Sequence, residues 1–227
     1  MDEMKNNAMI AGIGGASLGT EIAKCLKLAG RYNIFGCDIA SHAYGLYDDN
    51  FEKTFLVSEK NYIRSVIDCC LKAGCGSIIP GGEAPQKLIN GALGEFADNG
   101  IKVIGNSHDI VDVCTNKVRT FDELKSHGIP IPESTQVRCA EDLEKISMPC
   151  IIKPACNSGG SVFTFYAGNV SEAFIYAQYI LNMGGIPLAQ EYISADAGEF
   201  TVGVLSLPDL TIVGSIALKR DFTAKLS

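Results

Sequence analysis

The stretch SMPCIIKPACNSGGSVFTFY, residues 147–166, decides how the second half of the chain folds. A short apolar run at residues 150–152 leads to Lys153, and Pro154 excludes a helix at this point. A second β-rich run, residues 162–166, follows a small polar loop. We interpret the stretch as a β-hairpin whose tip offers backbone N–H groups and hydroxyls to an anion, with one lysine at its base. Considered alone, an ordinary exposed hairpin explains it equally well.

Composition limits the classes of function. The chain has 227 residues, enough for one large or two small domains, and its hydrophobic content of 47% can fill a core. The net charge of −7 argues against a general binder of nucleic acid or anionic membranes, which uses basic patches. We find no charged-then-apolar leader and no apolar run of membrane-spanning length. We therefore expect small-molecule partners, with no nucleic acid and no membrane.

Cysteine usage indicates the cellular compartment. The chain holds nine cysteines, an odd number, and none of them forms a Cys-x-x-Cys pair. This scatter favours reduced thiols in a cytoplasmic protein over a disulfide framework. The three histidines are dispersed, so we expect no Cys/His metal site.

The first 105 residues alternate between strand and helix patterns. A strand at residues 8–13 runs into a glycine-rich turn, followed by a helix at 18–29 and a strand at 33–37 that ends in Asp38. The glycine spacing is G-x-G-G-x-x-x-G, which departs from the dinucleotide fingerprint and is also typical of tight helix–strand packing. Further strands are expected at 54–57, 77–80 and 101–104, with helices at 62–73 and 85–98. This order predicts an α/β fold, a doubly wound parallel-sheet domain over residues 1–105.

The pattern changes after Gly105, where no further βα unit follows directly. We predict helices at 107–114, 118–127, 140–146 and 171–182, and strands at 135–138 and 187–193 besides the hairpin. Two last strands, 199–207 and 210–218, meet at the turn dipeptide Pro208-Asp209.

Three segments in this order resemble the ATP-grasp superfamily, in its carbamoyl-phosphate-synthase-like, carboxylate–amine ligase branch. They are TNKVRTFDELKSHGIPIPES at 115–134, MPCIIKPACNSGGSVFTFY at 148–166 and LAQEYISADAGEFTVGVL at 188–205. The segment IIPGGE at 78–83 is similar to that family's first domain. The resemblance implies a Rossmann-like pre-ATP-grasp domain over 1–105, the N-terminal lobe of an α+β ATP-grasp fold over 106–193, and an incomplete start of the C-terminal lobe over 194–227.

The resemblance also implies ATP as the bound nucleotide and assigns residues to it. Lys117 and Lys153 would contact phosphates, and Glu199 would bind ribose hydroxyls. The backbones of Glu191 and Ile193 would meet the adenine edge, while Lys219 and Arg220 would approach phosphates or the acyl substrate. The flexible loop over the triphosphate would be Ser158, Gly159, Gly160 and Ser161, and the linker between lobes would be Gln190, Glu191, Tyr192 and Ile193. Solvated surface lysines and an amphipathic strand are the ordinary alternatives for these positions.

The activity implied by the resemblance is ATP-dependent ligation. Mg-ATP would activate a carboxylate, or bicarbonate, as an acyl-phosphate, and an amine or ammonia would displace the phosphate. That family's Mg²⁺ ligands are expected beyond Ser227, so we expect residues 1–227 alone to lack turnover. They would be part of a longer enzyme, or a second chain would complete the fold, and a homodimer is an open alternative. Neither the catalytic residues nor the identity of the carboxylate and amine follows from the sequence.

Two other functions stay open at this point. One is an NAD(P)-binding oxidoreductase or epimerase that uses the first glycine turn and Asp38; it would need a Tyr-x-x-x-Lys pair, and none of the eight tyrosines has a lysine four residues on. The other is a non-catalytic regulatory domain that kept the ATP-grasp fold.

Overall fold

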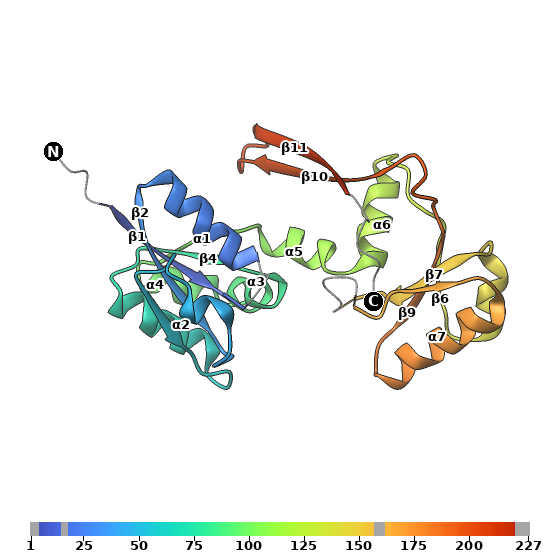
Figure 1. Cartoon of the computed structure of the whole chain (residues 1–227), viewed down its shortest axis with the longest axis horizontal. Helices are drawn as coiled ribbons and strands as arrows, with labels where there is room; N and C mark the ends of the chain where they lie inside the picture. Colours follow the sequence, from blue (N-terminus) through green and yellow to red (C-terminus); the bar gives the residue numbers. More distant parts are fainter. Residues whose placement is uncertain (1–4, 15–17, 157–161, 221–227) are drawn as a thin grey trace. The chain divides into compact units, whose positions relative to one another are not determined.

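The computed structural model describes residues 5–14, 18–156 and 162–220. The chain forms two compact units, whose elements are labelled in Figure 1. One unit contains the residues up to Pro130 together with Ala155 and Cys156, and the other contains Ile131–Pro154 and the described residues from 162 onward. The boundaries predicted after residues 105 and 193 stay predictions.

The first unit is built on a five-stranded parallel sheet with the strand order β3-β2-β1-β4-β5. This confirms the doubly wound α/β fold expected from the alternating pattern. The strands are β1 (Asn6–Ala11), β2 (Tyr32–Asp38), β3 (Lys53–Leu56), β4 (Ser77–Pro80) and β5 (Lys102–Val103).

Six α-helices and one 3₁₀ turn accompany this sheet in the described part of the unit. The single helix predicted for 85–98 is wrong, because Gly91 and Ala92 interrupt it; glycine weakens a helix interior, and Ala92 leaves helical geometry with φ −133°. The elements are α1 (Leu18–Ala29), η1 (Tyr44–Tyr47), α2 (Tyr62–Lys72), α3 (Glu83–Asn90), α4 (Leu93–Asp98), α5 (His108–Cys114) and α6 (Lys117–Ser126).

The sheet has a buried core on both faces. Successive residues of a strand point to opposite sides, and β1 follows this rule. Met9 joins the cluster that contains Val66 of α2 and Phe96 of α4, whereas Ile10 joins the cluster that contains Ala23 of α1. Helices therefore cover both faces, which explains why residues 8–11 of β1 are a continuous apolar run.

Glycines at the ends of β1 and β4 let three backbone segments meet. The N–H of Gly19 donates to the carbonyl of Gly81 at 3.0 Å, and the N–H of Gly81 donates to Ala11 at 2.7 Å. A Cβ on Gly19 would lie 2.1 Å from the carbonyl oxygen of Gly12, and one on Gly81 would lie 2.2 Å from the same atom. The glycine-rich turn is thus required by helix–strand packing, whether or not a ligand binds beside it.

We predict that Gly19→Ala destabilises the first unit by about 1–3 kcal/mol, the usual cost of overpacking, because backbone atoms must move to admit the methyl group. Gly94→Ala is the control, since a Cβ there meets nothing within 4 Å and Gly94 lies in the exposed part of α4. It should leave stability unchanged or raise it by up to about 1 kcal/mol. Urea unfolding measures the stability of both variants. Equal midpoints would show that the close backbone approach of Gly19 to Gly12 and Gly81 is not needed for stability.

The second unit contains a four-stranded antiparallel sheet with the order β6-β9-β7-β8. The hairpin predicted from the opening stretch is confirmed by the pairing of β7 with β8, but β8 begins at Phe165 and not at residue 162. Phe163 has a positive φ of 57°, which is typical of a turn. The elements are β6 (Ser134–Gln136), the 3₁₀ helix η2 (Ala140–Lys145), β7 (Cys150–Pro154), β8 (Phe165–Ala167), α7 (Val170–Asn182) and β9 (Pro187–Glu191).

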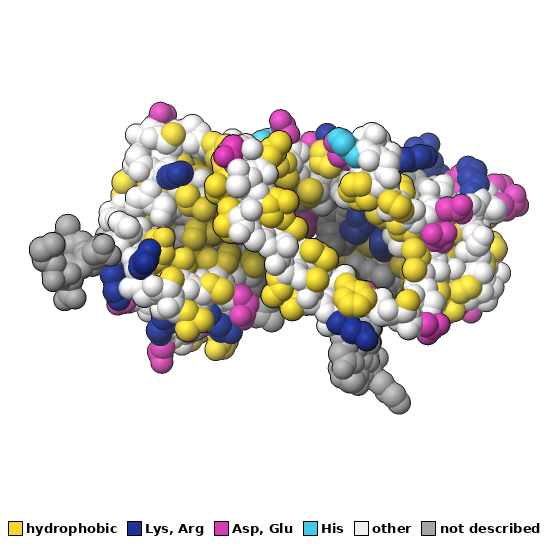
Figure 2. Space-filling view, turned by 90° about the horizontal axis from the view of Figure 1, so that it is seen from above, with side chains coloured by type: hydrophobic (Ala, Val, Ile, Leu, Met, Phe, Trp, Pro, Cys, Tyr) yellow, Lys and Arg dark blue, Asp and Glu magenta, His cyan; other side chains and the backbone are white. Residues whose placement is uncertain are grey.

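A separate two-stranded hairpin, β10 (Glu199–Ser206) with β11 (Ile212–Arg220), follows β9. Its side chains are exposed throughout, apart from the half-buried Glu199. Hydrophobic side chains such as Phe200, Val202 and Ile216 are more than half exposed. Figure 2 shows hydrophobic side chains at many places on the surface. An isolated two-stranded hairpin is marginally stable in water. Among the helices in the described part of the chain, none is both long and apolar enough to cross a membrane.

Candidate functional site

The strand β7 separates a buried face of the second sheet from a face that carries polar side chains. Cys150 and Ile152 are fully buried and pack in the cluster that contains Ala173 and Ala177 of α7. Lys153 is half-buried and alternates with them, so it lies on the face away from α7. The core under α7 therefore fixes which way Lys153 points.

Gln190 of β9 holds the end of the Lys153 side chain. The ammonium Nζ of Lys153 donates to Oε1 of Gln190 at 2.6 Å. The pairing of β7 with β9 sets Ile151 opposite Gln190, and paired residues of an antiparallel sheet share a face. The structure thus brings together two of the residues that the sequence analysis assigned to one site.

The segment after β9 is held by hydrogen bonds on both sides. The N–H of Glu191 donates to the carbonyl of Glu133 at 2.9 Å, and the N–H of Tyr192 donates to that of Pro149 at 3.4 Å. The ring of Tyr166 meets the ring of Tyr192 edge-on, with centroids 5.2 Å apart. Tyr166 was not among the predicted site residues, although its place opposite Ile151 follows once the strands are in register.

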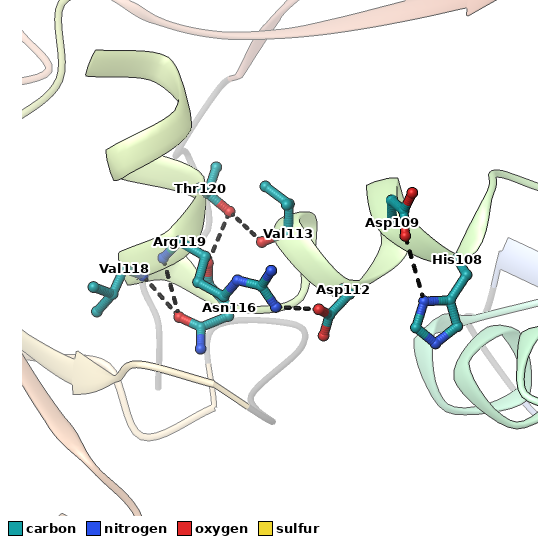
Figure 3. A network of polar contacts seen from close by, with 8 residues as sticks. All are labelled: His108, Asp109, Asp112, Val113, Asn116, Val118, Arg119 and Thr120. Atoms are coloured by element: carbon teal, nitrogen blue, oxygen red, sulfur yellow. Dashed lines mark hydrogen bonds and ion pairs between the residues drawn. The ribbon is translucent and has the colours of Figure 1, made fainter. Parts of the chain in front are cut away.

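Lys117 lies in the first unit, at the first residue of α6, one residue before the start of the helix predicted at 118–127. Figure 3 shows the polar network between α5 and α6 that fixes this helix start. The side-chain oxygen of Asn116 accepts from the N–H groups of Val118 at 3.0 Å and Arg119 at 3.2 Å, which is an N-cap. Thr120 Oγ1 donates to carbonyls of both helices, at Val113 and Asn116, each at 2.9 Å.

Three further contacts tie α5 and α6 to each other and to the segment that follows β7. Arg119 pairs with Asp112 across the two helices (Figure 3). The N–H of Lys117 donates to the carbonyl of Ala155 at 2.8 Å, and Asn116 forms an isolated antiparallel bridge with Cys156. Ala155 comes two residues after Lys153 in the chain. The backbone of Lys117 is therefore fixed by neighbours on both sides.

Glu199 and Arg220 form an ion pair with each other. They are directly opposite in the register of β10 and β11, and the guanidinium of Arg220 donates to the Glu199 carboxylate. Glu199 was expected to contact a ribose, and Arg220 to approach phosphates or the acyl substrate. A register counted back from a two-residue turn at Pro208-Asp209 would set Glu199 opposite Leu218. The longer loop and the register shift between Leu205 and Ser206 place it opposite Arg220.

Other assigned positions have less structural information. Ser158, Gly159, Gly160 and Ser161 lie outside the described residues. Within residues 5–14, 18–156 and 162–220, no group of three or more His, Cys, Asp or Glu side chains is arranged to hold a metal ion.

Asp38, the residue on which a dinucleotide site would depend, has a structural role in the loop after β1. Its two carboxylate oxygens accept from the N–H of Ile13 at 2.8 Å and the N–H of Ala40 at 2.9 Å. These bonds hold the ends of β1 and β2 together and need no ribose.

Comparison with known proteins identifies the second half of the chain. Residues 114–213 match the family model described as ATP-grasp domain. An uncharacterized protein of Methanocaldococcus jannaschii is 24% identical over 192 residues, which is 81% of this chain and 44% of that protein. The carbamoyl phosphate synthase large chain of Haemophilus ducreyi is 25% identical over 141 residues, 60% of this chain and 13% of that one. The chain thus spans less than half of either relative.

The fold has a counterpart among solved structures. The ADP complex of N5-carboxyaminoimidazole ribonucleotide synthetase superposes with a TM-score of 0.72 at 13% identity, covering 95% of this chain and 54% of that one. Together with the family match over residues 114–213 and the sequence relatives, this fold supports a similarity of the chain to the ATP-grasp superfamily, in its carboxylate–amine ligase branch.

Proposed function

We propose that the chain is the ATP-binding part of a ligase that activates a carboxylate, or bicarbonate, as an acyl-phosphate for attack by an amine or ammonia. The observation that carries the proposal is the contact of Lys153 with Gln190 on the face of the sheet away from α7. Support comes from the relatives named above, which include a carbamoyl phosphate synthase and a synthetase solved with ADP.

The proposed phosphate contact depends on the kind of partner that Lys153 has. The Oε1 of Gln190 is neutral, so the hydrogen bond that Lys153 donates to it orients the ammonium and does not itself cancel the charge. A carboxylate at the same place would form an ion pair and compete with a phosphate. Lys153 would therefore approach ATP as an oriented positive charge, and Lys117 would add a second one from the start of α6.

The adenine edge needs one hydrogen-bond acceptor and one donor from the segment at Gln190, Glu191, Tyr192 and Ile193. The N–H of Glu191 already donates to Glu133, so Glu191 would offer its carbonyl as the acceptor. Ile193 lies beyond the end of β9 and is 63% exposed, and its N–H would be the donor. The Tyr166–Tyr192 contact would limit the movement of this segment.

The proposed reaction has two steps. A carboxylate oxygen attacks the γ-phosphorus of ATP, which releases ADP and forms an acyl-phosphate; the amine then attacks the acyl carbon and releases phosphate. Bound Mg²⁺ would neutralise charge on the phosphates, with ligands predicted beyond Ser227. The residues of this chain would bind and orient the nucleotide.

We predict that Lys153→Ala lowers the affinity for ADP about tenfold or more, because a charge-assisted hydrogen bond contributes roughly 1.5–3 kcal/mol. Calorimetry on a protein that continues past Ser227 measures this. Arg138→Ala is the control, since it removes one exposed cation from the same unit. If the wild type and Lys153→Ala bind ADP with equal affinity, Lys153 is not part of the site. If the wild type binds neither ADP nor ATP, the proposal is refuted.

We predict that Asn116→Ala destabilises the start of α6 by about 1 kcal/mol through the loss of an N-cap, and that it weakens ADP binding by releasing Lys117. Asn61→Ala is a matched control, because Asn61 is the N-cap residue of α2 but makes no side-chain cap bond. Thermal unfolding and calorimetry check the two effects. A loss of stability with unchanged affinity would contradict the phosphate role of Lys117.

We predict that phosphate release from ATP by the longer protein requires Mg²⁺, a carboxylate and an amine together, and that residues 1–227 alone release none. A coupled phosphate assay across a panel of carboxylates and amines measures this. Nucleotide binding without turnover on any pair would favour the regulatory alternative, and turnover by residues 1–227 alone would contradict the predicted place of the Mg²⁺ ligands.

A further inference from the structure

The first unit contains a cavity that neither the packing of its core nor the proposed nucleotide site uses. It has a volume of about 490 Å³, within the usual range for small-molecule sites. It opens where β1, β2 and β4 end, and its walls include Gly12, Asp38 and Gly81. In the order β3-β2-β1-β4-β5 the chain turns back between β1 and β4, and ligands of open α/β sheets bind at this switch point.

The charged side chains that line the cavity are all acidic. They are Asp38, Glu59 and Glu83, and none of the described lining residues is Lys or Arg. Lys87 neutralises part of this charge, since its Nζ lies 3.3 Å from a carboxylate oxygen of Glu83. Asp38 and Glu59 have no such cationic partner among the described ion pairs, so the cavity presents a net negative surface to a ligand.

Asp38 gives the cavity a fixed acceptor. Its side chain is held by the N–H groups of Ile13 and Ala40, and the residue is only 9% exposed. Each carboxylate oxygen has a second lone pair beyond the one used by the backbone. The group can therefore accept from a ligand without rearranging.

The rest of the cavity is apolar. Ile39, Pro85 and Leu88 contribute aliphatic surface, and Tyr62 contributes an aromatic ring. Burial, together with the nearby Cys37 and Asp38, raises the pKa of the Tyr62 phenol, so the ring stays neutral near pH 7. An aromatic face attracts cations, and the aliphatic wall favours a ligand with a hydrocarbon body.

We propose that this cavity binds a small organic amine, with its protonated amino group beside Asp38 and Glu59 and its apolar body against Ile39, Pro85 and Leu88. A phosphate group fits the lining poorly, because the described lining residues include no Lys or Arg to offset its charge. The start of α3 also lines the cavity, but Glu83 already supplies the negative charge that a helix N-terminus favours.

The binding prediction goes beyond the proposed ligation and can be tested apart from it. An amine is also the chemical class of the nucleophile proposed above, but the cavity is lined by the first unit alone, whereas Lys153 and Gln190 belong to the second. Loss of ADP binding in Lys153→Ala would leave amine binding intact, so either proposal can fail without the other.

The test uses three probes with similar hydrocarbon bodies: phenethylamine, 2-phenylethanol and 3-phenylpropionate. Each is titrated into the ¹⁵N-labelled full chain, with the amides of Gly12, Gly14, Gly81 and Gly82 as reporters of the cavity. We expect saturable shifts with the amine. The alcohol should bind about fivefold or more weakly, because it lacks the positive charge, and the carboxylate should give no saturable shifts. Added salt should weaken the binding of the amine and leave the binding of the alcohol unchanged.

Variants identify the groups responsible. Glu59→Gln combined with Glu83→Gln should lower the affinity for phenethylamine about fivefold. The control combines Glu52→Gln with Glu95→Gln, at exposed positions outside the cavity, and should leave this affinity unchanged. Leu88→Lys, at a half-exposed wall position, should abolish binding. The proposal is overturned if the amine gives no saturable shifts at these glycines, or if 3-phenylpropionate, inorganic phosphate or NAD binds there more tightly.

Discussion

The alternation along β7 is the constraint on which the proposed nucleotide site depends. Cys150 and Ile152 are fully buried under α7, so Lys153 must point to the other face. A slip of one residue in the strand register would exchange the side chains on the two faces of β7. It would place an ammonium group in an apolar core, at a free-energy cost far above that of a lost surface contact. The packing of the second unit therefore sets the direction of Lys153, and its contact with Gln190 follows from the pairing of β7 with β9.

The first unit positions its polar groups by backbone contact. Gly12, Gly19 and Gly81 approach so closely that β1, β4 and the start of α1 meet at one point. Asp38 completes this junction by holding the loops after β1 and β2 with its two oxygens. The same junction leaves the cavity beside it, so the glycine-rich turn and the acidic lining have one structural origin.

Local patterns predicted much of this architecture. The helix expected at 18–29 has those bounds, and the β7–β8 hairpin and the start of α6 beside Asn116 were also expected. Two local features were missed, the break at Gly91 and the turn at Phe163. The Glu199–Arg220 pair was also missed, because it needs the register of the last hairpin. Periodicity reports which face of an element is apolar, but it does not report which side chain lies opposite another.

Charge placement, more than total charge, separates the two proposed binding regions. The chain carries a net charge of −7, which considered alone suggests no anionic ligand. Yet Lys153 has a neutral amide as its hydrogen-bond partner at Gln190, whereas Asp38 and Glu59 line a cavity without a described cation in its wall. Coulomb energy falls with distance and with screening, so groups within a few ångströms of a ligand outweigh the remaining surface. An overall acidic protein can thus hold an oriented lysine for a phosphate in one unit and carboxylates for an amine in the other.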